Sequence, residues 1–182
     1  MTRSAKSAPV HRLALRVREI GQLFNSMDPT PFLNKDLDPE AEAFIETWAS
    51  GYVAGSRFHI TIHLEQWPAD GDPTVMLTGA IHNHFNYKAG RARSALKRLM
   101  RDGRTSLVIG LVFVSLCLIA ADAIGGSASP GNSIARESLT IVGWVAMWRP
   151  LQIFLYDWWP LQRQTRRYQM LGNAHIQVIQ GK

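Results

Sequence analysis

The chain has 182 residues, of which 46% are hydrophobic and 19% charged, and its formal net charge is +6. These averages are those of an ordinary soluble domain, but the apolar residues are concentrated after Arg104. The basic balance could suggest nucleic-acid binding, yet the sequence has neither an RNA-recognition pattern of interleaved aromatic residues nor zinc-finger spacing, so no nucleic-acid partner is expected. The single cysteine, Cys117, lies inside an apolar run, which excludes a disulfide within the chain.

Residues 1–27 form the first predicted element, an amphipathic helix. Its apolar residues recur at helical spacing, and arginines lie between them: Leu13, Val17, Ile20 and Phe24. Such a helix would pack on the cytoplasmic domain or a neighbouring subunit, or lie on anionic lipid. Residues 28–37 begin with Asp28-Pro29-Thr30-Pro31, and two prolines exclude helical continuation, so this segment is interpreted as a connector.

Residues 38–104 are predicted to form a small cytoplasmic α+β domain. Asp38 suits a helix N-cap, Pro39 the first helical position and Gly51 the terminator. One apolar face of this helix is expected to carry Phe44, Ile45 and Trp48.

The segment Arg57 to Gln66 alternates apolar and polar residues and therefore predicts a strand. Turn-forming residues follow, and Thr74 to Ala80 is interpreted as a second strand, which gives a β-hairpin. A two-stranded sheet is marginal alone, so it must pack on a helix or on another subunit. From Ile81 onward the pattern is helical and basic, and it predicts a long helix that continues into the membrane.

Two apolar stretches within residues 105–159 predict a transmembrane helical hairpin. The first, Thr105 to about Ile124, meets the roughly 20 residues needed to cross the hydrocarbon core. The second lies between Ser138 and Pro160, and the short loop between them makes the spans antiparallel neighbours. Residues 160–182 form a basic cytoplasmic tail that could end in a short strand, AHIQVIQ.

Basic residues flank both spans on one side only. Six of them precede the first span, three follow the second, and the connecting loop holds Arg136 alone. The positive-inside rule therefore predicts that both termini are cytoplasmic.

Arg149 leaves the register of the second span open. If the span runs from Leu139 to Tyr156, Arg149 lies near the midplane and needs a partner from outside the chain. If the span runs from Ser133 to Trp148, Arg149 marks the cytoplasmic boundary and an interfacial helix begins at Pro150. Aromatic residues favour the second register, since their rings prefer the headgroup boundary. The predicted membrane-interface anchors are Trp148, Trp158 and Trp159. The polar residues expected to contact a partner or line a pore are Arg149, Gln152, Tyr156 and Asp157.

Four histidines near the predicted hairpin could converge on a zinc or copper ion: His59, His63, His82 and His84. The same spacing is also typical of histidines on a solvent-exposed strand face that bind no metal. The sequence has no P-loop, no GxGxxG and no GxSxG motif, so neither a catalytic residue nor a cofactor is expected.

The segments REIGQLFNSMDPTPF, KDLDPEAEAFI and WVAMWRPLQIFLYDWWP resemble those of a group of small uncharacterised proteobacterial two-span inner-membrane proteins. The resemblance covers most of the chain and implies a bacterial cytoplasmic membrane location. It carries no catalytic residues.

Together these features predict a non-enzymatic integral membrane protein. It would bind membrane lipids and act as an oligomeric scaffold, or as an accessory or assembly subunit of a larger membrane complex. The alternative is an oligomeric channel or ion pore lined by the second span. A metal-binding enzyme or sensor at the membrane surface is a third hypothesis.

Overall fold

The computed structural model describes residues 9–25, 27, 35–68, 71–124 and 130–181. The chain divides into two compact units, which are described separately. The sheet unit comprises Met1–Ala92 and Arg163–Lys182, and the helical unit comprises Arg93–Gln162. The tail therefore belongs to the same unit as the N-terminal segment.

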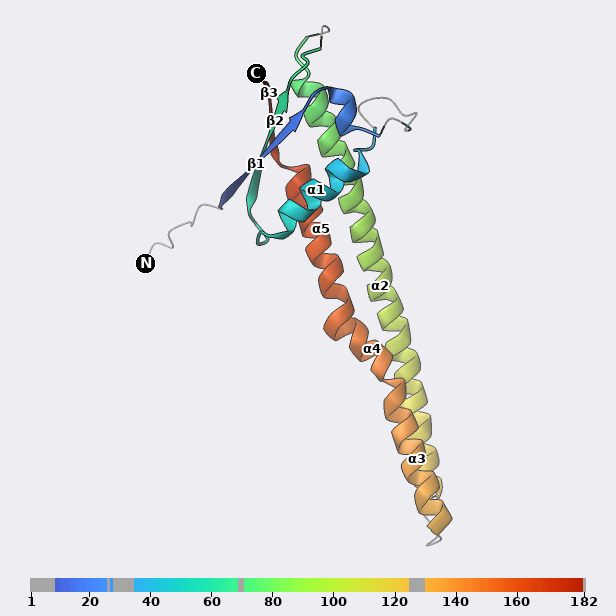
Figure 1. Ribbon diagram of the computed structural model, residues 1–182. Coiled ribbons are helices and arrows are strands. Elements are labelled where there is room, and N and C mark those ends of the chain that lie inside the picture. The colour runs from blue at the N-terminus through green and yellow to red at the C-terminus, as the bar shows by residue number, and fades with distance from the viewer. Residues whose placement is uncertain (1–8, 26, 28–34, 69–70, 125–129, 182) are drawn as a thin grey trace, which may run out of the picture. The chain divides into compact units, whose positions relative to one another are not determined.

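In the described part of the sheet unit, three parallel strands form one sheet in the order β1-β2-β3 (Figure 1). They are β1 (Val10–Val17), β2 (Arg57–Leu64) and β3 (His175–Gln180). Parallel neighbours need long crossover connections. The first crossover contains the 3₁₀ turn η1 (Ile20–Leu23) and the helix α1 (Pro39–Ser50), and the second contains the whole chain between Leu64 and His175.

The prediction of an N-terminal amphipathic helix is wrong, because this segment forms strand β1 and the turn η1. Within VHRLALRV, Leu13 is buried and Leu15 and Val17 are partly buried, whereas Arg12, Ala14 and Arg16 are exposed. This alternation has the period of two that a strand requires. Leu13, Val17 and Ile20 also fit a helical period, and pairing with β2 decides between the two patterns. Most of the predicted connector, residues 28–34, lies outside the described residues.

The predicted β-hairpin is also wrong. Strand β2 is present as expected, but Thr74 to Ala80 is the start of helix α2 (Thr74–Ile124), which has 51 residues. Asp72 fixes this start, because its Oδ1 accepts hydrogen bonds from the Thr74 backbone nitrogen at 2.9 Å and from the Thr74 hydroxyl at 2.6 Å. Leu77, Ala80 and Ile81 are then buried at the spacing of one helical face. The predicted long helix into the apolar run is confirmed, with an earlier beginning.

Helix α1 begins as the sequence predicts. Asp38 Oδ1 accepts hydrogen bonds from the backbone nitrogens of Glu40 at 2.9 Å and Ala41 at 3.3 Å, with Pro39 in the first turn. Ile45 is buried and Trp48 partly buried, but Phe44 is 55% exposed and lies off the packed face.

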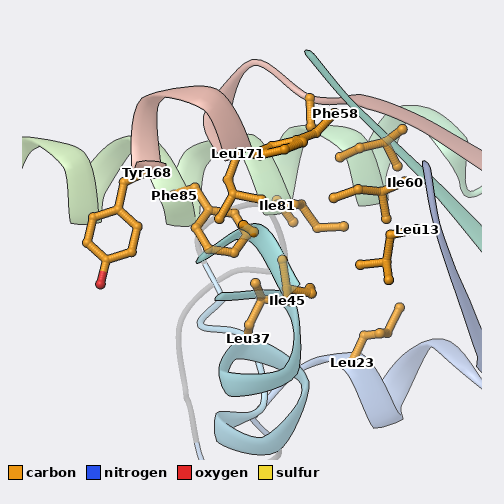
Figure 2. Packing of buried hydrophobic residues seen from close by; sticks show 14 of the residues in the cluster. Leu13, Leu23, Leu37, Ile45, Phe58, Ile60, Ile81, Phe85, Tyr168 and Leu171 are labelled. Atoms are coloured by element: carbon orange, nitrogen blue, oxygen red, sulfur yellow. The ribbon is translucent and has the colours of Figure 1, made fainter. Parts of the chain in front are cut away.

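The core of the sheet unit lies between one face of the sheet and the helices α1, α2 and α5 (Trp158–Gly172). Figure 2 shows Leu13 and Ile60 of the strands pointing toward Ile45 of α1 and Ile81 of α2. The other face of the sheet carries residues that are exposed or only partly covered by the described residues: Arg12, Arg16, His59, Thr61, His63 and Gln177.

The helical unit contains two helical runs. One is the later part of α2, and the other is α3 (Pro130–Ala146), α4 (Trp148–Gln152), a π-helical turn η3 (Ile153–Asp157) and the start of α5. The helices Thr74–Ile124 and Gly131–Gly172 are each long and apolar enough to cross a membrane, by length and composition. Residues 125–129 of the predicted connecting loop lie outside the described residues.

Glycines mark where the two runs approach each other. A Cβ atom at Gly110 would lie 3.1 Å from Met147 Sδ, and one at Gly143 would lie 3.2 Å from Cys117 Cβ. A Cβ atom at Gly103 would lie 2.8 Å from a methyl carbon of Ile153. Rising residue numbers on α2 thus meet falling numbers on the second run, so the packed segments are antiparallel. Small residues at such contacts allow the two helix backbones to approach each other closely.

Candidate functional site

The four histidines proposed as metal ligands have separate environments. His59 and His63 lie on the outer face of β2, whereas His82 and His84 lie on α2 beneath the sheet. His82 Nε2 is 2.8 Å from the Ala174 carbonyl oxygen, and His84 is bonded to carboxylates. Among the described residues, no group of three or more His, Cys, Asp and Glu side chains is arranged to hold a metal ion.

His84 is the buried centre of a polar cluster. Its Nδ1 lies 3.0 Å from Asp36 Oδ1, and its Nε2 lies 3.2 Å from Glu42 Oε2. Both ring nitrogens are therefore occupied by carboxylates on opposite sides, and this arrangement orients the imidazole between α2 and the start of α1. Buried polar groups that are satisfied in this way fix a packing arrangement.

Lys88 extends the cluster one helical turn further along α2. Its ammonium group pairs with Glu42 and, at 2.5 Å, with Glu46 Oε1, and it lies 5.0 Å from the centre of the Tyr168 ring. Desolvation, together with the positive charge of Arg91, lowers the pKa of Lys88, and Asp36 opposes this shift. Desolvation also raises the pKa of Tyr168, whose hydroxyl oxygen accepts a hydrogen bond from Gln164 at 3.0 Å. The cluster thus connects α1, α2 and α5 through contacts among its own groups.

A pocket of about 670 Å³ opens at the amino ends of the three strands. We call it the amino-edge pocket. Its walls come from the starts of β1, β2 and β3, the turn before β2, and the end of α5. Its lining residues are Val10, Ala54, Gly55, Ser56, Arg57, Phe58, His59, Arg166, Gln169, Met170, Asn173 and His175.

The turn before β2 shapes one wall of this pocket. Gly55 has φ +95°, a backbone conformation that residues with a side chain rarely adopt, and its backbone nitrogen lies 3.3 Å from Met170 Sδ on α5. The next residue, Ser56, is only 5% exposed, and its Oγ is buried without a hydrogen-bond partner among the described residues. An unsatisfied buried hydroxyl is unusual in a folded protein.

The imidazoles at the pocket belong to neighbouring strands. His59 and His175 are register partners, and their ring centres lie 4.2 Å apart in an edge-to-face arrangement. On the other side of β2, Arg12 of β1 is the register partner of His59. Desolvation, followed by the charges of His175 and Arg12, lowers the pKa of His59. Arg12, together with Arg57 and Arg166 of the pocket lining, makes this edge of the sheet basic.

In the helical unit, Arg149 has a partner in its own chain. Its Nη1 donates a hydrogen bond to Asp157 Oδ2 at 3.4 Å, and the side chains are 61% and 29% exposed. The π-helical turn η3 lies between the two residues. Sequence reasoning sought a carboxylate for Arg149 only in the first span and in other subunits, and thus missed this pair.

The remaining predicted contact residues, Gln152 and Tyr156, are exposed in the helical unit. Of the predicted anchors, Trp148 and Trp159 are exposed, while Trp158 is partly buried and donates a hydrogen bond to the Phe154 carbonyl at 2.8 Å.

No family model, curated protein or solved structure matches this chain. Inference about its function therefore rests on the geometry described above.

Sequence reasoning missed most of the amino-edge pocket. His59 was singled out, but Ser56, Arg57, Arg166 and His175 were not. Arg166 and His175 lie in the tail, more than a hundred residues from the other two. A usable signal exists in the sequence, since the first residues of β2 and β3 are the basic residues Arg57 and His175. Only the parallel arrangement of the strands brings these two residues to the same edge.

Proposed function

We propose that this chain is an integral membrane protein that spans the bilayer twice, and that it serves as a non-enzymatic scaffold or accessory subunit of a larger membrane complex. The observation that carries the proposal is the apolar surface of the helical unit. The two described runs leave many large apolar side chains exposed, on both helices and over several turns: Val108, Ile109, Val112, Leu116, Ile119, Ile141, Val142, Trp144 and Val145.

Such a surface is unfavourable in water, at about 25 cal/mol for each Å² of apolar area. Lipid chains would cover it at no such cost. The close contacts at Gly110 and Gly143 support the same reading, because small residues allow two spans to pack without a hydrophobic driving force between them. Arg149 and Asp157 fit the register in which the hydrocarbon span ends near Trp148, since both then lie at the boundary as a pair.

The charge distribution supports a bacterial cytoplasmic membrane location with both termini in the cytoplasm. A basic series precedes the apolar part of α2, and Arg163, Arg166 and Arg167 follow the second run. The sheet unit would then lie on the cytoplasmic side.

The sheet supports the scaffold role. Parallel sheets are usually covered on both faces, whereas one face of this sheet is covered by helices and the other is open in the described part of the chain. No further strand pairs with β1 or β3 among the described residues, so both edges offer backbone groups for pairing. A second copy or another subunit would complete the structure.

Gentle extraction into lipid nanodiscs, followed by light scattering, tests the proposal. We expect the chain to stay with the membrane fraction after an alkaline carbonate wash, and to have a protein mass greater than that of one chain. Release by carbonate would contradict membrane insertion. A monodisperse monomer that co-purifies with no other protein would contradict the scaffold role.

A further inference from the structure

The amino-edge pocket has the chemical character of an anion site. Its lining residues include two arginines, Arg57 and Arg166, and two histidines, His59 and His175, and none of the described residues that line it has a carboxylate. The two arginines come from different elements, β2 and α5, so the site exists only when the tail is folded onto the sheet. Guanidinium groups recognise phosphate and carboxylate oxygens through paired hydrogen bonds.

The size and the apolar part of the lining define the ligand further. A volume of about 670 Å³ is within the range of pockets that hold small organic ligands, and it exceeds what a single inorganic anion fills. Val10, Phe58 and Met170 supply apolar surface beside the charged groups. We propose that the amino-edge pocket binds an organic phosphate ester, with its phosphate group held by Arg57 and Arg166. This chemistry is shared by soluble phosphorylated compounds and by the headgroups of anionic phospholipids.

Binding is tested with the full-length protein in a neutral maltoside detergent by isothermal titration calorimetry. The probes are glycerol 3-phosphate, a short-chain phosphatidylglycerol and, as the neutral lipid control, a short-chain phosphatidylcholine. We expect at least one phosphate-bearing anionic probe to bind, and phosphatidylcholine to bind more weakly. Binding of glycerol 3-phosphate assigns a soluble phosphate ester, and binding of phosphatidylglycerol alone assigns a lipid headgroup. Failure of both anionic probes would overturn the proposal.

Substitutions locate the site. Arg57→Ala and Arg166→Ala should each weaken binding about tenfold or more, because a hydrogen bond to a charged group is lost. The matched control is Arg16→Ala, which removes an exposed arginine near the opposite end of β1.

Equal losses in the Arg16→Ala control would show non-specific electrostatic binding and overturn the proposal. So would unchanged affinity in both pocket variants. Arg57→Lys provides a folded variant that retains charge, and we expect it to bind more weakly than the wild type, because a lysine cannot form the paired hydrogen bonds. Thermal transitions of all variants separate loss of binding from loss of folding.

The pH dependence gives a further readout with sulfate, which does not titrate near neutrality. His59 is faced by His175 on β3, Arg12 on β1, and the pocket arginines Arg57 and Arg166, and its pKa is lowered. A bound anion opposes this repulsion and raises the pKa of His59, so binding takes up a proton. Affinity should therefore rise as pH falls from about 7 to about 5.5, and His59→Gln should reduce this dependence. An unchanged pH dependence in His59→Gln would contradict the place of His59 in the site.

Discussion

Two glycines of the sheet unit show how one residue type serves different purposes. Gly172 ends α5 where a Cβ atom would lie 2.5 Å from Asn86 Oδ1 and 3.4 Å from the Asn86 backbone nitrogen on α2. Gly90 lies within α2, and a Cβ atom there would meet nothing within 4 Å. The first glycine permits a close approach of two helices, whereas the second weakens its helix without a packing reason.

We therefore expect opposite effects of alanine at these positions. Gly90→Ala should raise the free energy of unfolding by about 0.5 to 1 kcal/mol, because alanine loses less backbone entropy in a helix. Gly172→Ala should lower it by about 1 to 3 kcal/mol, since Asn86 must move. Urea denaturation of the full-length protein in detergent, followed by tryptophan fluorescence, measures both changes. Stabilisation by Gly172→Ala would show that the contact between α5 and α2 is looser than described.

At the scale of elements, the helical unit is held by a seam of small and medium residues. On the apolar part of α2, a series of buried or partly buried positions recurs at alternating spacings of four and three: Gly103, Leu107, Gly110, Val114, Cys117 and Ala121. This heptad-like repeat is the pattern of helices that cross at a small angle. Gly143 on α3 packs directly on this seam, against Val114 and Cys117.

This contact predicts a specific disulfide. In a Gly143→Cys variant, the new Cβ would lie 3.2 Å from Cys117 Cβ, close to the roughly 3.5 to 4.5 Å of natural disulfides. Since Cys117 is the only cysteine of the wild type, mild oxidation in detergent should give an intramolecular cross-link, seen as a mobility shift that a reductant reverses. Val145→Cys is the matched control, because Val145 is exposed and should not react with Cys117. Equal cross-linking of both variants would contradict the described packing of α3 on α2.

At the scale of the whole molecule, the sheet unit is built from both ends of the chain. Its central strand β2 is flanked by β1 from the N-terminal segment and by β3 from the last residues. Leu171 and Ile176, which follow the helical unit in sequence, are part of the same buried core as Leu13 and Ile45. The sheet unit is thus incomplete until the chain has passed through both apolar runs.

Residues 1–92 alone should therefore not fold. The fragment lacks β3 and the later part of α5, which leaves one edge of β2 unpaired and uncovers the core at Phe85. We expect far-UV circular dichroism without a cooperative thermal transition, and rapid proteolysis. Addition of residues 163–182 through a flexible linker, which omits the helical unit, is the matched control and should restore a cooperative transition. A cooperative transition in the shorter fragment would show that β3 is dispensable.

The sequence alone determined the features that depend on local chemistry or on long periodic patterns. Asp38 specifies a helix start through hydrogen bonds within three residues, and Pro39 suits the first helical position. The alternation of Arg57 to Leu64 specifies a strand with one buried face. The apolar runs are long enough to be recognised by length and composition. The mixed helix and sheet content and the continuous helix into the first run follow from these signals.

Only the tertiary structure decided how the strands pair and which residues meet. Leu13 and Val17 fit both a helical and a strand period. The choice depends on pairing with Ile60 and Leu64 of β2, each 47 residues further along the chain. The pairing of Arg149 with Asp157 depends on the path of the helix through η3. The environment of each histidine depends on which face of its strand or helix is buried. The amino-edge pocket needs β2 and the tail side by side, although more than a hundred residues separate Arg57 from Arg166 and His175. Contacts between residues so far apart in sequence form because they bury the common core, and local sequence patterns do not predict them.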